Sequence, residues 1–319
     1  MDGVMTTNVL VIDTKAAEYA KRLRAEFSGI RVFEARTLAE LADDPAEIDV
    51  LISLGLGVDD ALFRKAVRLK WAQCLAAGVD RFLKCRSFRR DVILTSMRGI
   101  HGPAMRESAA LLMLTLARDL PRHVRNQSAH RWDRGQQWPL LCGKTAVIAG
   151  IGVAGTAIGQ LLHAFGMRVV GLTRTPRAID GFDAMAPLDQ LTAFAAEADY
   201  LIDVLPGTDE NRARFGREVF AAMKPGAFFV NIGRGDTVDQ AALHECLAAN
   251  RIAGAALDVF PTTPLPADSP FWDMPNVLIT PHISGFFAGY EDYALPIIID
   301  NMRLFLAGRT DEMTNIVAH

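Results

Sequence analysis

The sequence predicts an α/β protein built from two doubly wound parallel sheets. Short runs of β-branched and other apolar residues alternate with longer helical patterns along the whole chain, which is typical of βαβ units and of a parallel sheet. The chain has 319 residues, enough for two domains. Half of these residues are hydrophobic and 22% are charged, as in an ordinary globular protein.

The first third of the chain contains the first alternating series. Helices are expected at residues 14–27 and 59–67, where polar and apolar positions follow the helical period. Strands are expected at residues 9–12, 30–33, 50–53, 69–74 and 92–95.

The alternation changes near residue 100 and then resumes. Residues 97–103 contain two glycines and a proline, and residues 105–120 form one long, largely apolar helical pattern. Residues 122–140 are polar and too irregular for a strand. Six further strands suit a doubly wound sheet, and a helical tail follows at 290–307. The six strands are expected at residues 145–149, 168–172, 200–204, 227–232, 254–259 and 277–280.

Composition argues against several classes of partner. The net charge is -3 and no basic face is clustered, so we expect neither nucleic acid nor an anionic membrane as partner. The longest apolar runs, residues 109–117 and 295–299, are too short to span a bilayer. The N-terminus lacks the pattern of a signal peptide. The four cysteines have no metal-ligand spacing, so we expect reduced thiols, no metal and a cytoplasmic protein.

A glycine motif follows the strand predicted at 145–149. Gly150, Gly152 and Gly155 form G-x-G-x-x-G with Val153 and Ala154 before a helical pattern. Gly150 would make the tight turn, Gly152 would let a pyrophosphate approach, and Gly155 would allow close packing of helix and sheet. Glycine-rich turns also arise for packing alone, but the order of strand, turn and helix favours a dinucleotide site.

The end of the next strand bears on the choice of coenzyme. NAD-binding chains usually carry an acidic residue here for the ribose 2′-OH, whereas this chain has Thr173, Arg174 and Arg177. A hydroxyl and guanidinium groups suit a 2′-phosphate. NADP is therefore the expected coenzyme, with NAD possible, although Arg177 could equally be a solvated surface charge.

Three polar residues follow three of the later strands. They are Arg234, Asp258 and His282. Ligands of open parallel sheets bind at the carboxyl ends of the strands. A guanidinium can hold the carboxylate and keto oxygen of a 2-keto acid, and an imidazolium can protonate the developing alkoxide. Taken singly, the histidine could be structural and the aspartate could cap a turn.

The chain resembles the D-isomer-specific 2-hydroxyacid dehydrogenases over nearly its full length, and within them the glyoxylate and hydroxypyruvate reductases. Besides the glycine motif, the resemblance is carried by residues 70–73, 77–80, 98–103, 223–227, 231–235, 256–260 and 280–282. It implies that Arg234 binds substrate, that His282 is the acid/base residue, and that Asp258 lies near the nicotinamide amide.

The resemblance also implies further site residues. The backbone around Ala77, Gly78 and Val79 would hold the substrate carboxylate. Ile232 would join the coenzyme-binding residues, and Pro206, Gly207 and Thr208 would line the adenosine side. Candidates for the substrate pocket are Leu54, Gly55, Leu56, Met97, Arg98, Phe286, Phe287 and Tyr290.

Domain organisation and assembly are implied in the same way. A Rossmann coenzyme domain, residues 99–284, would be inserted into a flavodoxin-like substrate domain made of residues 1–98 and 285–319. The apolar helix at 105–120 and the loop bearing Trp132 and Trp138 resemble the region through which the family dimerises. A homodimer is therefore expected, the alternative being a core helix followed by a mobile loop.

One departure from the family concerns the partner of the histidine. Thr263 stands where the family usually has a glutamate, although Glu291 or Asp292 could supply a carboxylate instead. Two other functions stay open. The missing glutamate, with Ser284 and Gly285 after the histidine, would suit oxidation of a small anion such as formate. A dinucleotide-sensing regulatory protein would need neither Arg234 nor His282.

Overall fold

The computed structural model describes residues 6–42, 44–55, 58–135 and 138–319. The chain forms two compact units, Met1–Ile100 with Phe287–His319, and His101–Phe286. The first boundary follows Ile100 where residue 98 was expected, and the second follows Phe286 where residue 284 was expected. Each unit is a parallel α/β layer structure, so the predicted fold class is confirmed.

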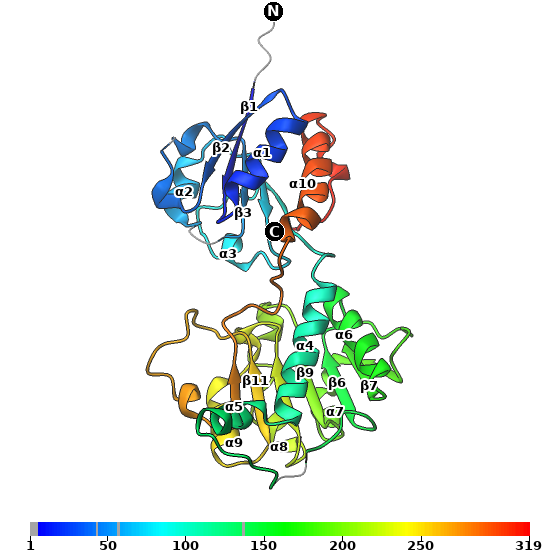
Figure 1. Cartoon of the computed structure of the whole chain (residues 1–319). Coiled ribbons are helices and arrows are strands. Elements are labelled where there is room, and N and C mark those ends of the chain that lie inside the picture. The colour runs from blue at the N-terminus through cyan, green and yellow to red at the C-terminus, as the bar shows by residue number, and fades with distance from the viewer. Residues whose placement is uncertain (1–5, 43, 56–57, 136–137) are drawn as a thin grey trace, which may run out of the picture. The chain divides into compact units, whose positions relative to one another are not determined.

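The first unit contains a parallel sheet in the order β2-β1-β3-β4-β5, which is the flavodoxin-like order. Figure 1 shows this unit with α1 and α10 side by side. Its strands are β1 (Thr7–Ile12), β2 (Ile30–Ala35), β3 (Val50–Ser53), β4 (Trp71–Cys74) and β5 (Ile93–Thr95). Its helices are α1 (Ala16–Glu26), α2 (Asp60–Lys65), α3 (Asp80–Leu83) and α10 (Tyr290–Leu306).

Alternating residues of β1 supply two separate cores in the first unit. Val9 and Val11 pack with side chains of α1 and α10, whereas Leu10 and Ile12 pack with side chains of α2 and α3 on the other face. Successive side chains of a strand point to opposite faces. A continuous apolar run therefore produces a sheet that is covered on both sides.

The second unit contains a parallel sheet in the order β12-β11-β10-β9-β6-β7-β8. This order reverses between β6 and β9, the position where doubly wound sheets bind ligands. Its strands are β6 (Thr145–Ala149), β7 (Arg168–Thr173), β8 (Ala184–Pro187), β9 (Tyr200–Asp203), β10 (Phe228–Asn231), β11 (Gly254–Leu257) and β12 (Val277–Ile279). Its helices are α4 (Gly102–Ala117), α5 (Leu120–Ser128), α6 (Val153–Ala164), α7 (Leu191–Ala195), α8 (Arg217–Ala222) and α9 (Gln240–Ala248).

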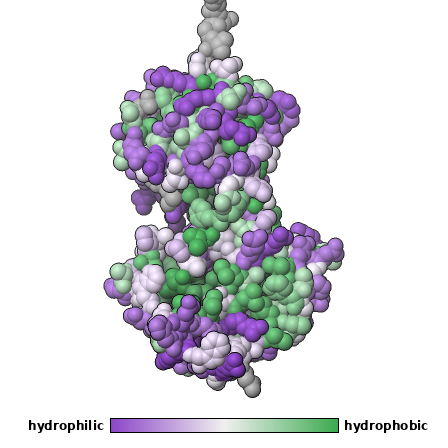
Figure 2. Space-filling view, viewed as in Figure 1, coloured by the Kyte–Doolittle hydropathy of each residue, from purple (hydrophilic) through white to green (hydrophobic). Residues whose placement is uncertain are grey.

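The second sheet is likewise covered on both faces. Helices α7, α8 and α9 pack on one face, and α4 and α6 pack on the other. The outward side of α4 remains apolar, with Leu111 60% and Leu114 42% exposed. Figure 2 shows hydrophobic residues gathered on the face of this unit where α4 lies.

Two elements of the second unit differ from the sequence prediction. We predicted six strands, but β8 adds a seventh at the edge of the described sheet, paired with β7. The polar, irregular sequence of residues 122–140 predicts no regular structure, but α5 occupies Leu120–Ser128. In the part of the chain that the structure describes, no helix is both long and apolar enough to cross a bilayer.

Candidate active site

A tight glycine turn joins β6 to α6. Gly150 has a φ of 103°, and a Cβ on it would lie 2.8 Å from the Val204 carbonyl oxygen. A Cβ on Gly155 would lie 2.1 Å from the Gly150 carbonyl oxygen, whereas one on Gly152 would meet nothing within 4 Å. Gly150 and Gly155 therefore fit the strand-to-helix turn closely, and Gly152 leaves open space before α6. The unpaired N–H groups of the first helical turn can bind a pyrophosphate there.

The expected ribose-binding residues follow β7. Thr173 is half-buried at the end of this strand, whereas Arg174 and Arg177 are exposed. The Arg174 guanidinium lies 3.9 Å from the Glu210 carboxylate, a partner 36 residues away that spacing along the chain does not reveal. Pro206 and Thr208 are exposed and follow β9, the strand beside β6. The turns after β6 and β9 thus lie at the reversal of strand order, and β7 is the next strand beyond β6.

Arg234 lies in a loop that is held by hydrogen bonds to β10. The Asn231 amide nitrogen donates to the Arg234 carbonyl oxygen at 3.0 Å, and the Asn231 amide oxygen accepts from Gly233 N at 3.0 Å. The Arg234 guanidinium itself donates to the Gly233 carbonyl oxygen at 2.8 Å. Ile232 is only 4% exposed. The last residue of β10 therefore fixes the backbone that carries Arg234.

Asp258 organises the segment that carries His282. It is 2% exposed, and its carboxylate accepts hydrogen bonds from Thr280 Oγ1 at 2.5 Å, Ile283 N at 2.9 Å and Ser284 N at 3.0 Å. These donors stand on both sides of His282. The family resemblance implies that Asp258 lies near the nicotinamide amide; in the structure both of its carboxylate oxygens accept hydrogen bonds from this segment.

His282 itself has an unusual backbone. Its φ of 58° lies in the left-handed region, which a residue with a side chain adopts at a cost. The contacts of Asp258 offset that cost. On the other side, Ser108 of α4 donates from its hydroxyl to the Ser284 carbonyl oxygen at 3.0 Å. The exposed imidazole is therefore carried by a backbone that is fixed from two sides.

Thr263 is exposed, and its hydroxyl donates to the Phe260 carbonyl oxygen at 3.4 Å. A hydroxyl has one proton to donate. While Thr263 donates it to the Phe260 carbonyl oxygen, Thr263 can accept a hydrogen bond from an imidazole but cannot donate one to it. Glu291, the alternative acid, forms an ion pair with Lys15 at 2.7 Å. This contact, led by the hydrogen bond from Lys15, lowers the pKa of Glu291.

The first unit carries the other expected substrate residues. Ala77 is exposed, and Gly78, Val79, Leu54 and Phe287 are half-buried. The Arg98 guanidinium donates to the Ile316 carbonyl oxygen at 3.1 Å, and the Tyr290 hydroxyl donates to the Leu75 carbonyl oxygen at 2.6 Å.

Two further residues expected in the substrate pocket, Met97 and Leu56, are not among these. Met97 is 0% exposed and packs in the core with Trp71 and Leu295, so its side chain offers no surface to a substrate. Leu56 lies outside the described residues.

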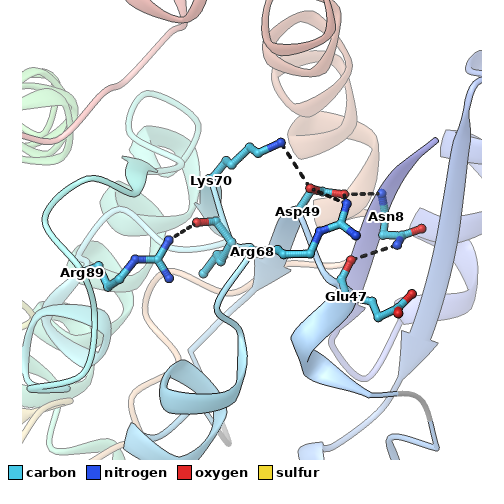
Figure 3. Close-up of polar contacts among 7 residues, drawn as sticks. Asn8, Glu47, Asp49, Arg68, Lys70 and Arg89 are labelled. Carbon is cyan, nitrogen blue, oxygen red and sulfur yellow. Dashed lines mark hydrogen bonds and ion pairs between the residues drawn. The ribbon is translucent and has the colours of Figure 1, made fainter. Parts of the chain in front are cut away.

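A separate polar cluster lies at the amino-terminal ends of β3 and β4. Asp49 accepts hydrogen bonds from Asn8 N at 3.1 Å and from Arg68 at 3.3 Å, and pairs with Lys70 at 3.4 Å (Figure 3). Arg89 donates to the Leu69 carbonyl oxygen at 2.6 Å. A cavity of about 460 Å³ lies beside these cations. Because they bind Asp49 and a backbone carbonyl, these cations hold the strand ends together.

The described residues contain no cluster of three or more His, Cys, Asp or Glu side chains that could hold a metal ion. Cys74, Cys85, Cys142 and Cys246 form no disulfide bonds with one another, and Cys142 is exposed.

Known proteins of one family are similar to this chain. The model of the D-isomer specific 2-hydroxyacid dehydrogenase family, NAD binding domain, matches residues 110–284. Glyoxylate/hydroxypyruvate reductase B of Enterobacter sp. strain 638 is 34% identical over 323 residues, which cover 97% of each chain.

Solved structures are similar over almost the whole chain. A D-isomer specific 2-hydroxyacid dehydrogenase family protein from Aeromonas salmonicida has a TM-score of 0.87 at 33% identity, covering 98% of this chain and 99% of that one. An NADPH-dependent glyoxylate/hydroxypyruvate reductase from Sinorhizobium meliloti, in complex with NADP and sulfate, has a TM-score of 0.84 at 28% identity, covering 98% of each chain.

Proposed function

Because this chain belongs to the D-isomer specific 2-hydroxyacid dehydrogenase family and is an NAD(P)-dependent oxidoreductase, we propose that it reduces glyoxylate, hydroxypyruvate or a related small 2-keto acid to the 2-hydroxy acid. One observation carries the proposal. Arg234, Asp258 and His282 follow β10, β11 and β12, which are neighbours in the sheet that also bears the glycine turn. The names of similar reductases support the substrate class.

Each residue has a distinct task in the proposed reaction. When bound, the coenzyme supplies the hydride. The forked guanidinium of Arg234 holds the substrate carboxylate and polarises the keto oxygen. The protonated imidazole of His282 donates a proton to that oxygen as negative charge develops on it. Asp258 holds the backbone on both sides of His282, and the backbone of Ala77, Gly78 and Val79 supplies further donors to the carboxylate.

We expect NADPH to be preferred over NADH by at least about tenfold, or about 1.4 kcal/mol. Thr173 and Arg174 stand at the ribose position, and Arg174 offers its guanidinium to a 2′-phosphate. Arg174→Ala should remove most of the preference, measured as the ratio of kcat/KM for the two coenzymes. Arg177→Ala is the matched control and should have a smaller effect. Equal use of the two coenzymes by the wild type would contradict this assignment.

The pH dependence of reduction tests the position of Thr263. In the family a carboxylate at this position stabilises the imidazolium, whereas a hydroxyl brings no charge. Reduction needs the protonated imidazole, so kcat/KM falls as pH rises through the pKa of His282, and we expect that fall to begin near or below neutrality. Thr263→Glu should move the fall upward by about 1–3 units.

Thr263→Gln is the matched control for that experiment. Its amide has the length of a glutamate side chain but no charge, so its profile should stay near that of the wild type. Superimposable profiles for Thr263→Glu and the wild type would show that another group sets the pKa of the catalytic acid.

We propose that two copies of the chain associate through the surface around α4 and α5. Large apolar side chains are exposed there, and contiguous exposed apolar surface marks an interaction site. They are Leu111, Leu114, Leu120, Val124, Trp132 and Leu140. Trp138 packs against His123 of α5, with ring centroids 5.2 Å apart. The family resemblance implies that Trp138 lies near the neighbouring subunit.

Light scattering should therefore give twice the 34.8 kDa mass of the chain. Leu111→Glu should shift the protein toward a monomer, since it places a charge in the apolar surface. Val67→Glu is the control, because Val67 is similarly exposed, at 63%, but lies in the first unit. A fully active wild-type monomer would refute this assembly.

A screen of coenzyme oxidation distinguishes the proposed function from its alternatives. We expect NADPH to be consumed with glyoxylate or hydroxypyruvate and to persist without a keto acid. Reduction of NADP⁺ by formate, without keto-acid reduction, would support oxidation of a small anion. Coenzyme binding without turnover of any of these compounds would support a sensor.

A further inference from the structure

A buried acid lies beneath the Arg234 loop. Asp203 is the last residue of β9 and is 0% exposed. It stands between Ala149 of β6 and Asn231 of β10 in the register of the sheet. Its Oδ1 accepts a hydrogen bond from Leu205 N at 2.8 Å, and its Oδ2 forms a short hydrogen bond with the Thr237 hydroxyl. The proposed mechanism assigns no task to this carboxyl group.

Thr237 connects Asp203 to the backbone of Arg234. Thr237 Oγ1 lies 2.5 Å from the Arg234 carbonyl oxygen as well as within bonding distance of Asp203 Oδ2. Both of these oxygens are acceptors when Asp203 is ionised, yet a hydroxyl has a single proton to donate. An ionised Asp203 therefore takes that proton, and the Arg234 carbonyl loses the hydrogen bond from Thr237 Oγ1 while it keeps the one from Asn231.

Protonation of Asp203 resolves this conflict. The acid then donates to Thr237 Oγ1, and Thr237 donates to the Arg234 carbonyl oxygen. The contact between Asp203 and Thr237 and the contact between Thr237 and Arg234 then contain one proton each. Arg234 O then accepts from two side chains, Asn231 and Thr237. The added side-chain donor fixes this backbone carbonyl more firmly, and the guanidinium of the same residue is positioned with it.

We propose that Asp203, in its protonated form and through Thr237, is the positioning residue for Arg234. The proposal rests on the proposed role of Arg234 in holding the keto acid. It assigns a purpose to a titratable group that is buried in the centre of the sheet. Asp203 itself touches neither substrate nor coenzyme in this account.

The electrostatic environment favours the protonated form near neutral pH. Burial raises the pKa of Asp203 to about 7, against the smaller lowering effects of the bonds from Thr237 and Leu205 and of the charge of Arg234. Arg234 is the charged group that acts on it, since the adjacent strands present Ala149 and Asn231 at this level. The chain of hydrogen bonds is complete at lower pH and is lost as pH rises through about 7.

Asp203→Asn tests the proton directly. Asparagine can accept from Leu205 N through Oδ1 and can donate permanently to Thr237 through Nδ2, as the protonated acid does. The KM for the keto acid should be measured for the wild type and for Asp203→Asn at each pH. The wild-type KM divided by the Asp203→Asn KM should rise about three- to tenfold between about pH 6 and about pH 8.5, the effect of one hydrogen bond. Titration of His282 affects both proteins and cancels in the ratio. A ratio that does not change with pH would overturn the proposal.

Thr237 variants test the connection. Thr237→Ser keeps the hydroxyl and should keep the wild-type change of KM with pH, whereas Thr237→Val should abolish it and raise KM for the keto acid at low pH. The KM for NADPH should move in neither variant, which separates positioning of Arg234 from a general loosening of the unit. Equal effects on both KM values would overturn the proposal.

Thermal unfolding reports the protonation of Asp203 without any turnover. The folded protein keeps this proton to about pH 7, whereas an unfolded aspartic acid loses it near about pH 3.9. The Tm of the wild type should therefore fall relative to that of Asp203→Asn as pH rises from about 5 to about 8. Parallel Tm profiles would overturn the proposal. Absence of keto-acid turnover by the wild type would instead refute the proposed function, while the Tm comparison would still report the buried proton.

Discussion

Replacing His282 by Asn should lower kcat for keto-acid reduction by about 10²–10⁴-fold, the range of general acid catalysis. Asparagine can hold a hydrogen bond to the keto oxygen but cannot transfer a proton at neutral pH. Its tolerance of left-handed backbone suits the φ of 58° at this position. The loss should therefore report the missing proton donor and not a distorted loop.

Two measurements confine this effect to the chemical step. The dissociation constant of NADPH should stay within about threefold of the wild-type value, because the coenzyme would be held by the glycine turn and not by the imidazole. His163→Asn is the control, since this histidine lies on α6 with its side chain 53% exposed. Near wild-type kcat in His282→Asn would remove His282 from the mechanism.

Arg234→Ala should reduce kcat/KM for the keto acid by about 100-fold or more. The substrate carboxylate and keto oxygen would lose charged hydrogen bonds that contribute about 1.5–3 kcal/mol each. Arg234→Lys should recover only part of the activity, because an ammonium is a point charge without the planar fork of the guanidinium. KM and kcat should be measured separately, since a contact made equally in the ground and transition states changes KM alone.

A surface arginine of the same unit provides the comparison. Arg217 begins α8 and forms an exposed ion pair with Glu245 at 2.6 Å, so Arg217→Ala should leave kcat/KM nearly unchanged. If Arg234→Ala resembled Arg217→Ala in its kinetics, the substrate carboxylate would have to be bound elsewhere.

The sheets were predictable because their strands are short, apolar and separated by helical patterns. Parallel strands buried on both faces leave a strong signal in sequence. The edge strand β8 was missed because Ala184–Pro187 is only four residues long and ends in a proline, which resembles a loop. Helix α5 was missed because its sequence, LPRHVRNQS, is mostly polar and has one buried residue, Asn126.

The candidate site was predictable in its residue types but not in its contacts. Spacing along the chain predicts that Arg234, Asp258 and His282 follow neighbouring strands. It cannot predict which donors a carboxylate binds, and Asp258 is bound to the segment around His282. Met97 was wrongly expected to line a pocket because an apolar residue next to a strand end can face either the core or a ligand, and it faces the core.

The transfer of a labelled hydride tests the central claim most directly. Wild-type enzyme should be incubated with hydroxypyruvate or glyoxylate and NADPH deuterated at the reactive C4 position, and the product examined by mass spectrometry and NMR. The account predicts one deuterium at C2 of the 2-hydroxy acid, in step with coenzyme oxidation, and almost none in the same time with His282→Asn. Oxidation of the coenzyme without deuterium at C2, or labelling that persists at the wild-type rate in His282→Asn, would contradict it.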